Sequence, residues 1–280
     1  MKIGITGGKG GTGKSTIATA LAFELAKKAK VLLVDADVDC PDDHLILGID
    51  RKKIKTVYQR IPVWDTKKCI KCGQCGPVCK VNAIVSIKDK IPIFMQPQCN
   101  GCGACVIKCP VKAISWSKKE IGYLYEGKKH GIDFLSGELK INEPISEFVV
   151  NALKEKVDEI ESKYDHIIID TAAGTHCDVI SALEGCESVL AVTEPTPLGA
   201  HDLELILKLL RILKIKTKVV INRSDIGDKD LIKKIARKYN TGIIAEIPYS
   251  KKIIESYSRG KPVKDKGITR IIEGISKWKK

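Results

Sequence analysis

Short apolar runs and segments with helical spacing alternate along the first part of the chain. The runs KIGIT (2–6) and KVLLVDADVD (30–39) are apolar enough to be strands buried on both faces. Between them, STIATALAFELAKKA (15–29) places Ile17 and Leu21 on one helical face. Strand, glycine-rich loop, helix and strand form a βαβ unit, for which a right-handed crossover is expected.

The same alternation returns in the second half of the chain. Residues 143–162 have helical spacing, and YDHIIIDTAAG (164–174) is a further buried run that ends in a loop. The later segments of this kind are the runs SVLAVTEPTP (188–197), TKVVINRSD (217–225) and GIIAEIP (242–248), and the helical segments 198–213 and 228–239. This alternation predicts an α/β fold, in which a parallel sheet is covered by helices on both faces.

The pattern is interrupted between residues 61 and 116, where cysteines, prolines and short β-branched pieces take over. VCKVNAIVSI (78–87) and KCPVKAISWS (108–117) resemble each other at an offset of 30 residues, so the segment contains an internal repeat. The chain therefore divides into 1–60, an insertion at 61–116, and 117–280, with the two outer parts forming one α/β domain.

Composition narrows the class of protein. The chain has 280 residues, and it contains no run of 18 apolar residues that would predict a membrane helix. The start, MKIGITGG, lacks the apolar region of a secretory signal, so a cytoplasmic location is expected. The net charge of +14 comes from scattered lysines without an accompanying aromatic module, so no nucleic-acid partner is expected.

A glycine-rich loop follows the first strand and opens the first helix. Residues 8–15 fit G-x-x-x-x-G-K-[ST], a loop whose backbone N–H groups cradle phosphates. Lys14 is expected to reach the β- and γ-phosphate oxygens, and the Ser15 hydroxyl to bind Mg²⁺. The predicted nucleotide-binding residues here are Gly8, Lys9, Gly10, Gly11, Thr12, Gly13, Lys14, Ser15 and Thr16.

Three features of the sequence together resemble a known family: Lys9, which lies five residues before Lys14, and the segments VLLVDADVD and IIIDTAAG. The chain resembles the MinD/ParA/Mrp class of P-loop ATPases, which includes the nitrogenase iron protein. The resemblance covers nearly all of the chain outside the insertion. It implies ATP hydrolysis by a homodimer with ATP at the interface, in which Lys9 crosses to the nucleotide of the partner.

The resemblance also assigns roles to residues beyond the loop. Of the alternating Asp35, Asp37 and Asp39, Asp37 is expected to orient the attacking water, and Asp35 is the second candidate for water or Mg²⁺ contact. Asp170 would hold a Mg²⁺-bound water, and Gly174 would be the pivot of a second switch loop. Asn222 resembles the adenine-contacting asparagine of the family, beside Arg223, which is expected to stack on the base.

Eight of the eleven cysteines form two runs of the type C-x₂-C-x₂-C-x₃-C. This is the bacterial ferredoxin pattern, in which the fourth cysteine of each run binds the other cluster. The insertion is thus predicted to be a bacterial-type ferredoxin α+β domain with two [4Fe–4S] clusters; tetrahedral zinc is the alternative. The predicted ligand sets are Cys69, Cys72, Cys75 and Cys109 for the first cluster, and Cys99, Cys102, Cys105 and Cys79 for the second.

Several residues depart from these patterns. Lys80 stands where the motif has proline. The open alternatives are that it raises the potential of the cluster bound by Cys79, that it offers a docking charge, or that it is a neutral surface variation. Cys40 and Cys186 are expected to be buried free cysteines. Cys177 lies beside the second switch and carries the hypothesis of a third, intersubunit cluster. Residues 267–280 place isoleucines on one face of a helix that is expected to pack on the sheet.

Three functions remain open on this basis. The first is an ATP-gated dimer that delivers electrons from two [4Fe–4S] clusters to a metalloprotein partner. The second is an ATPase that assembles or carries iron–sulfur clusters or a metal cofactor. The third is a MinD/ParA-like spatial organiser, which would leave the cysteine runs unexplained.

Overall fold

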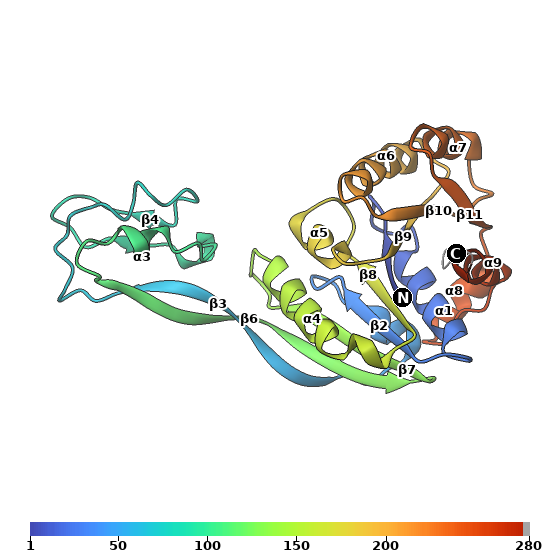
Figure 1. Ribbon diagram of the computed structural model, residues 1–280, viewed down its shortest axis with the longest axis horizontal. Coiled ribbons are helices and arrows are strands. Elements are labelled where there is room, and N and C mark those ends of the chain that lie inside the picture. The colour runs from blue at the N-terminus through green and yellow to red at the C-terminus, as the bar shows by residue number, and fades with distance from the viewer. Residues whose placement is uncertain (277–280) are drawn as a thin grey trace.

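The computed structural model describes residues 1–276, in which a nine-stranded sheet forms the centre of the larger part (Figure 1). The strand order is β11-β10-β9-β1-β8-β2-β7-β6-β3. The strands are β1 (Lys2–Thr6), β2 (Val31–Ala36), β3 (Lys52–Trp64), β6 (Ile114–Lys129), β7 (Ile132–Leu139), β8 (His166–Thr171), β9 (Ser188–Thr193), β10 (Lys216–Asn222) and β11 (Gly242–Ile247).

The strands from β11 to β7 pair in parallel, as expected, but β6 pairs antiparallel with both β7 and β3. The prediction of a wholly parallel sheet was therefore wrong at this edge. The reason lies in composition, because β3 reads KKIKTVYQRIPVW and carries polar residues on its exposed face, unlike a strand buried on both faces.

Helices cover both faces of the sheet, as the alternating pattern predicted. One core contains α1 (Lys14–Leu25), α2 (Asp43–Leu47) and α9 (Lys266–Ser276). The other contains α4 (Glu147–Ile160), α5 (Cys177–Leu183), α6 (Pro197–Ile212) and α7 (Lys229–Lys238). Single strands supply both cores: in β2, Leu32 and Val34 face one layer, and Val31 and Leu33 face the other.

The terminal helix α9 packs on the sheet, which confirms that expectation. Ile268, Ile271 and Ile275 are buried in the same core as α1. Residues 277–280, which belong to the predicted helical segment, lie outside the described part of the chain. Within the residues described, no helix combines the length and apolar character needed to cross a membrane.

A two-stranded stem extends from the sheet and carries a separate lobe at its end (Figure 1). β7 pairs with β6 only between Gly122 and Lys129, whereas β3 pairs with β6 along nearly its whole length. Residues 65–113 form the lobe between the two stem strands. Both stem strands run through residues 61 and 116, so the boundaries expected there fall inside continuous strands.

The lobe repeats one local structure twice. The N–H of Ala83 donates to Cys79 Sγ at 3.2 Å, and the N–H of Ala113 donates to Cys109 Sγ at the same distance. The lobe also contains β4 (Ile84–Val85), β5 (Ile93–Phe94), the 3₁₀ turn η1 (Gln96–Gln98) and α3 (Ala104–Lys108). The two halves of the sequence repeat thus adopt matching backbone turns around their fourth cysteines.

Candidate functional site

The glycine-rich loop connects β1 to α1, and its glycines allow backbone conformations that other residues rarely adopt. Gly11 and Gly13 have φ values of 81° and 90°, a region that other residues rarely adopt. α1 begins at Lys14, so its first backbone N–H groups have no partner within the helix. Together with the helix dipole, these N–H groups make the loop a site for phosphate.

Both lysines of the loop lie at this site. Lys14 is 6% exposed, and its ammonium lies 3.4 Å from the carbonyl oxygen of Lys9. The Thr12 hydroxyl donates to the same oxygen at 3.4 Å. Lys9 itself is half-buried and forms no ion pair within residues 1–276. The Lys9 side chain is therefore available to a phosphate or to a second subunit.

Acidic side chains surround the start of α1. Burial raises the pKa of Asp170 to about 7, and a hydrogen bond with the Ser15 side chain opposes the shift. Burial also raises the pKa of Asp42, again opposed by Ser15. Ser15 thus lies between two carboxyl groups, an arrangement suited to Mg²⁺, whose ligands are oxygen atoms. The sequence analysis had predicted Asp170 for this position. It had missed Asp42, for which the only signal was its position just after the Asp35–Asp39 segment.

The aspartates after β2 separate into three environments. Burial raises the pKa of Asp37, and the charge of Lys14 opposes that shift, so Asp37 lies beside the phosphate lysine. Asp35 is fully buried and accepts hydrogen bonds from the N–H groups of Asp37 and Asp43, both at 3.2 Å. Asp39 is exposed. Asp37 is therefore placed to contact a bound nucleotide, whereas Asp35 lies behind it.

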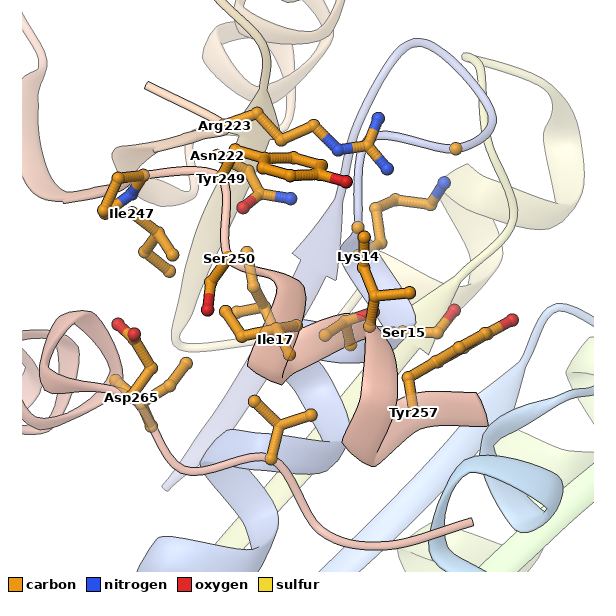
Figure 2. Close-up of a pocket in the computed structure, with 18 of the residues that line it drawn as sticks. Lys14, Ser15, Ile17, Asn222, Arg223, Ile247, Tyr249, Ser250, Tyr257 and Asp265 are labelled. Carbon is orange, nitrogen blue, oxygen red and sulfur yellow. The ribbon is translucent and has the colours of Figure 1, made fainter. Parts of the chain in front are cut away.

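A pocket of ≈ 400 Å³ opens beside the loop (Figure 2). Its lining includes Asn222, whose side-chain amide donates to the Thr12 carbonyl oxygen at 2.8 Å and so holds the loop. Arg223 also lines it and donates to Glu194 at 2.6 Å. Tyr249 lies close to Arg223 in this wall (Figure 2).

The pocket lining also includes residues that the sequence reasoning missed. They belong to the segment after β11 and to α8 (Lys251–Ser258), with Tyr249 and Tyr257 as its aromatic members. Both have exposed fractions near one half, at 46% and 45%. A base or a ribose could contact such rings, and the only sequence signal was their position after an apolar run that ends in proline.

The lobe brings the cysteines together in the two crossed sets. Cys69, Cys72, Cys75 and Cys109 line one small pocket, although Cys109 is 34 positions beyond Cys75. In the second set, burial raises the pKa of the Cys99 thiol, and the neighbouring Cys79 and Cys102 add to the shift. Burial also raises the pKa of Cys105 to about 11, with Cys99 and Cys102 nearby.

The spacing of these sulfur atoms bears on the group that they could hold. In residues 1–276, no three cysteine sulfurs lie within 4.8 Å of one another. A tetrahedral zinc ion with Zn–S bonds of about 2.3 Å would bring its four sulfurs to roughly 3.8 Å. The described cysteine sulfurs are therefore not gathered as tightly as that tetrahedral geometry requires.

The three other cysteines differ in exposure. Cys186 is buried, as expected, and burial raises its pKa to about 12. Cys40 is exposed, so the expectation of a buried cysteine was wrong there, because the loop after β2 runs over the surface. Cys177 is exposed at the start of α5. Its part in a third cluster remains a hypothesis.

Residues 3–263 match the model of the CobQ/CobB/MinD/ParA nucleotide-binding domain family. The chain belongs to this family. It is 35% identical over 280 residues to an uncharacterised protein of Methanocaldococcus jannaschii, covering 99% of this chain and 97% of that protein. It is 28% identical over 279 residues to the septum site-determining protein MinD of Thermotoga maritima, covering 95% and 82%.

Solved structures of the family share the fold. MinD of Pyrococcus horikoshii, complexed with Mg-ADP, gives a TM-score of 0.63 at 20% identity over 99% of this chain and 96% of that one. MinD of Pyrococcus furiosus gives 0.62 at 22% identity, over 99% and 98%. These matches confirm an α/β P-loop ATPase fold. They do not support iron–sulfur clusters, an inserted ferredoxin domain or electron transfer, and the relatives' names fit a spatial organiser better.

Proposed function

We propose that this chain is a nucleotide-switched ATPase that acts as an ATP-bound dimer and carries two [4Fe–4S] clusters in the lobe of residues 65–113. Membership of the MinD/ParA family supports the ATPase. The observation that carries the clusters is the convergence of eight cysteines into two crossed sets at the end of the stem. In this proposal, the lobe is a separate domain that is inserted into the ATPase domain.

In the ATPase reaction, backbone N–H groups of the loop and Lys14 bind the phosphates. The Ser15 hydroxyl and the Asp170 carboxylate would hold Mg²⁺, either directly or through water. Asp37 accepts a hydrogen bond from the attacking water and orients it toward the γ-phosphate. Lys9 from the other subunit neutralises charge that develops on the transferred phosphoryl group, as arginine fingers do.

In the lobe, Cys69, Cys72, Cys75 and Cys109 would hold one cluster, and Cys99, Cys102, Cys105 and Cys79 the other. Such clusters supply one-electron transfer when bound. The donor set fits them, because thiolate sulfur is the usual ligand of iron–sulfur clusters. The N–H of Gly101 already points at Cys99 Sγ at 3.4 Å, a contact that stabilises a thiolate.

Hydrogen bonds connect the nucleotide switch with the stem. The N–H of Leu139, at the end of β7, donates to the Val38 carbonyl oxygen at 2.8 Å. The next residue, Lys140, donates to the Ile121 carbonyl oxygen in β6 at 2.9 Å. A movement of the loop after β2 would therefore be transmitted to β6, which is one of the two strands that hold the lobe.

A spatial organiser is the second candidate, and the names of the curated relatives favour it. In that case the lobe would bind a surface or a partner rather than deliver electrons. An ATPase that assembles or carries clusters is the third candidate. It would need a pair of cysteines on its surface to pass a cluster on, and Cys186 is buried, so it could not form such a pair with Cys177.

Anaerobic iron reconstitution followed by EPR of the reduced chain, with and without Mg-ATP, distinguishes these functions. The proposal expects about eight irons per chain, and a signal or potential that changes with ATP. The matched variants are Cys79→Ser, which removes a ligand, and Cys40→Ser, which removes an exposed cysteine outside both sets. A chain without iron that binds lipid vesicles only with ATP would support the organiser. Iron that passes to an apo-acceptor would support assembly.

A further inference from the structure

A cluster of carboxyl groups lies behind the nucleotide pocket, beneath the loop that follows β2. Asp35 and Asp43 are 0% exposed, and Asp170 is 1% exposed. Asp42 is half-buried and lines the pocket, whereas the other three do not. The cluster therefore extends from the pocket wall into the protein interior.

The oxygen atoms of this cluster converge. One carboxylate oxygen from each of Asp35, Asp42 and Asp43 lies within 4.8 Å of the other two. Asp35 accepts two backbone hydrogen bonds, from Asp37 and Asp43. In contrast, both carboxylate oxygens of Asp43 are buried without a hydrogen-bond partner, and so is Oδ1 of Asp170.

No ion pair within residues 1–276 neutralises these groups, although the Ser15 hydroxyl hydrogen-bonds Asp42 and Asp170. None of the four carboxylates forms an ion pair with a lysine, arginine or histidine there. The ammonium of Lys14 is directed to the carbonyl oxygen of Lys9, and its charge acts on Asp42 and Asp170 without forming an ion pair with either. A buried carboxylate without a partner is destabilising by several kcal/mol, so the cluster requires protons or a cation.

We propose that Asp35, Asp42 and Asp43 bind a divalent cation, Mg²⁺ or Mn²⁺, without nucleotide. Carboxylate oxygens are the ligands of such hard cations, and the three carboxylates more than balance a charge of +2. The site differs from the one that Ser15 and Asp170 would offer beside nucleotide phosphates, because Asp35 and Asp43 lie behind the pocket. Asp42, which lines the pocket and hydrogen-bonds Ser15, borders both sites. Neither iron nor ATP hydrolysis is required.

A cation in this place would fix the loop that carries Asp37. Asp35 precedes the loop at the end of β2, and Asp43 follows it at the start of α2. Joining the two ends holds the loop in one conformation before ATP arrives. The cation would thus restrict the movement of the loop that carries Asp37, from the side that faces the protein interior.

The test is titration of the metal-free, nucleotide-free full chain with Mn²⁺, observing free Mn²⁺ by EPR. Mn²⁺ prefers oxygen ligands and leaves thiols largely aside. One saturable site is expected, with at least about tenfold weaker binding in Asp43→Asn, because one of its three carboxylates is lost. Asp39→Asn, in the same loop but exposed, should bind Mn²⁺ as the parent does.

The proposal is overturned if the parent chain shows no saturable Mn²⁺ binding, since the carboxyls are then held by protons. Unchanged binding in Asp43→Asn would also overturn it, because the ion would then lie elsewhere, for example in the nucleotide site. Circular dichroism checks that Asp43→Asn is folded. If it is not, Asp42→Asn is the replacement, since Asp42 is only half-buried.

Discussion

The side-chain amide of Gln59 donates a 2.6 Å hydrogen bond to the carbonyl oxygen of Cys99. Gln59 is 3% exposed and belongs to β3, whereas Cys99 is 9% exposed and opens the second cysteine run. On the other stem strand, Lys119 forms a largely buried ion pair with Glu143 at 2.6 Å, in the segment that leads to α4. The second cysteine set is therefore tied to the stem and the stem to the ATPase part.

Replacing Gln59 by leucine should loosen the second cysteine loop. The Cys99 carbonyl would lose its buried donor, which costs about 1–3 kcal/mol. We expect faster amide hydrogen exchange in residues 99–103, measured by mass spectrometry. Tyr58→Leu is the control, because the neighbouring Tyr58 is 52% exposed. Equal exchange in both variants would show that this hydrogen bond does not hold the loop.

Alanine at Gly13 should weaken ATP binding. A Cβ there would lie 2.3 Å from Nδ2 of Asn222, and its φ of +90° is unfavourable for alanine. We expect at least about tenfold weaker binding by fluorescent ATP titration, since 1.4 kcal/mol of strain is a factor of ten. Gly10→Ala is the matched control, because no atom lies within 4 Å of a Cβ at Gly10.

Adding Asn222→Ala to Gly13→Ala separates the two causes of weak binding. Removing the asparagine relieves the collision but leaves the strained φ, so part of the affinity should return. No recovery would assign the whole effect to the backbone or to loss of Asn222 itself. Parent-like binding by Gly13→Ala would contradict the loop geometry.

Replacing Lys14 and replacing Lys9 should impair different steps, namely ATP binding and ATP hydrolysis. Lys14→Ala should abolish ATP binding, whereas Lys9→Ala should bind ATP but hydrolyse it at least about 100-fold more slowly, as arginine-finger losses do. Phosphate release measures hydrolysis, and equilibrium dialysis measures binding. A mixture of the two variants should regain activity, since a mixed dimer has one intact loop facing one intact Lys9. Parent-like hydrolysis by Lys9→Ala would exclude its role across the interface.

Much of the nucleotide site could be predicted because it depends on local sequence. The loop of residues 8–15 lies between a strand and a helix, and that order alone fixes where Lys14 and Ser15 lie. Asp170 was singled out for the same reason, since it lies near the carboxyl end of β8, beside β1. The crossed pairing of the two cysteine runs was predicted from spacing in the same way, and it stays a prediction.

The parts that escaped prediction depend on contacts between distant segments. Asp43 begins a helix of five residues, too short for a periodic signal, and its burial arises from packing against β2 and β8. Tyr257 reaches the pocket only because α8 folds back toward the loop. The antiparallel edge formed by β3 and β6 has a mixed polar pattern, which local propensity does not distinguish from an irregular segment.

The cysteines outside the two sets should react with thiol reagents at different rates. The thiolate is the reactive form, and burial raises the pKa of Cys186 to about 12. Cys40 and Cys177 are exposed. In the iron-reconstituted chain, iodoacetamide at pH 8 should label these two at least about 100-fold faster than Cys186. Peptide mass spectrometry gives the rates. Rapid labelling of Cys186 would mean that α5 opens in solution, and protection of Cys177 would point to a ligand there.

The buried carboxyl group of Asp170 predicts how stability depends on pH when no divalent cation is present. Its pKa is raised from 3.8 to about 7, mainly by burial, so the folded chain holds a proton that the unfolded chain releases. Stability from this group is present at low pH and is lost as the pH rises through 7. In chelator, the free energy of unfolding from urea titrations should therefore fall between pH 5 and pH 8.

Asp170→Asn should flatten that slope, whereas Asp50→Asn, at an exposed position, should keep it. A slope that is the same in Asp170→Asn would assign the pH dependence to other groups. Mg²⁺ should restore more stability at pH 8 than at pH 5, because the ionised carboxylates bind it and the protonated ones do not.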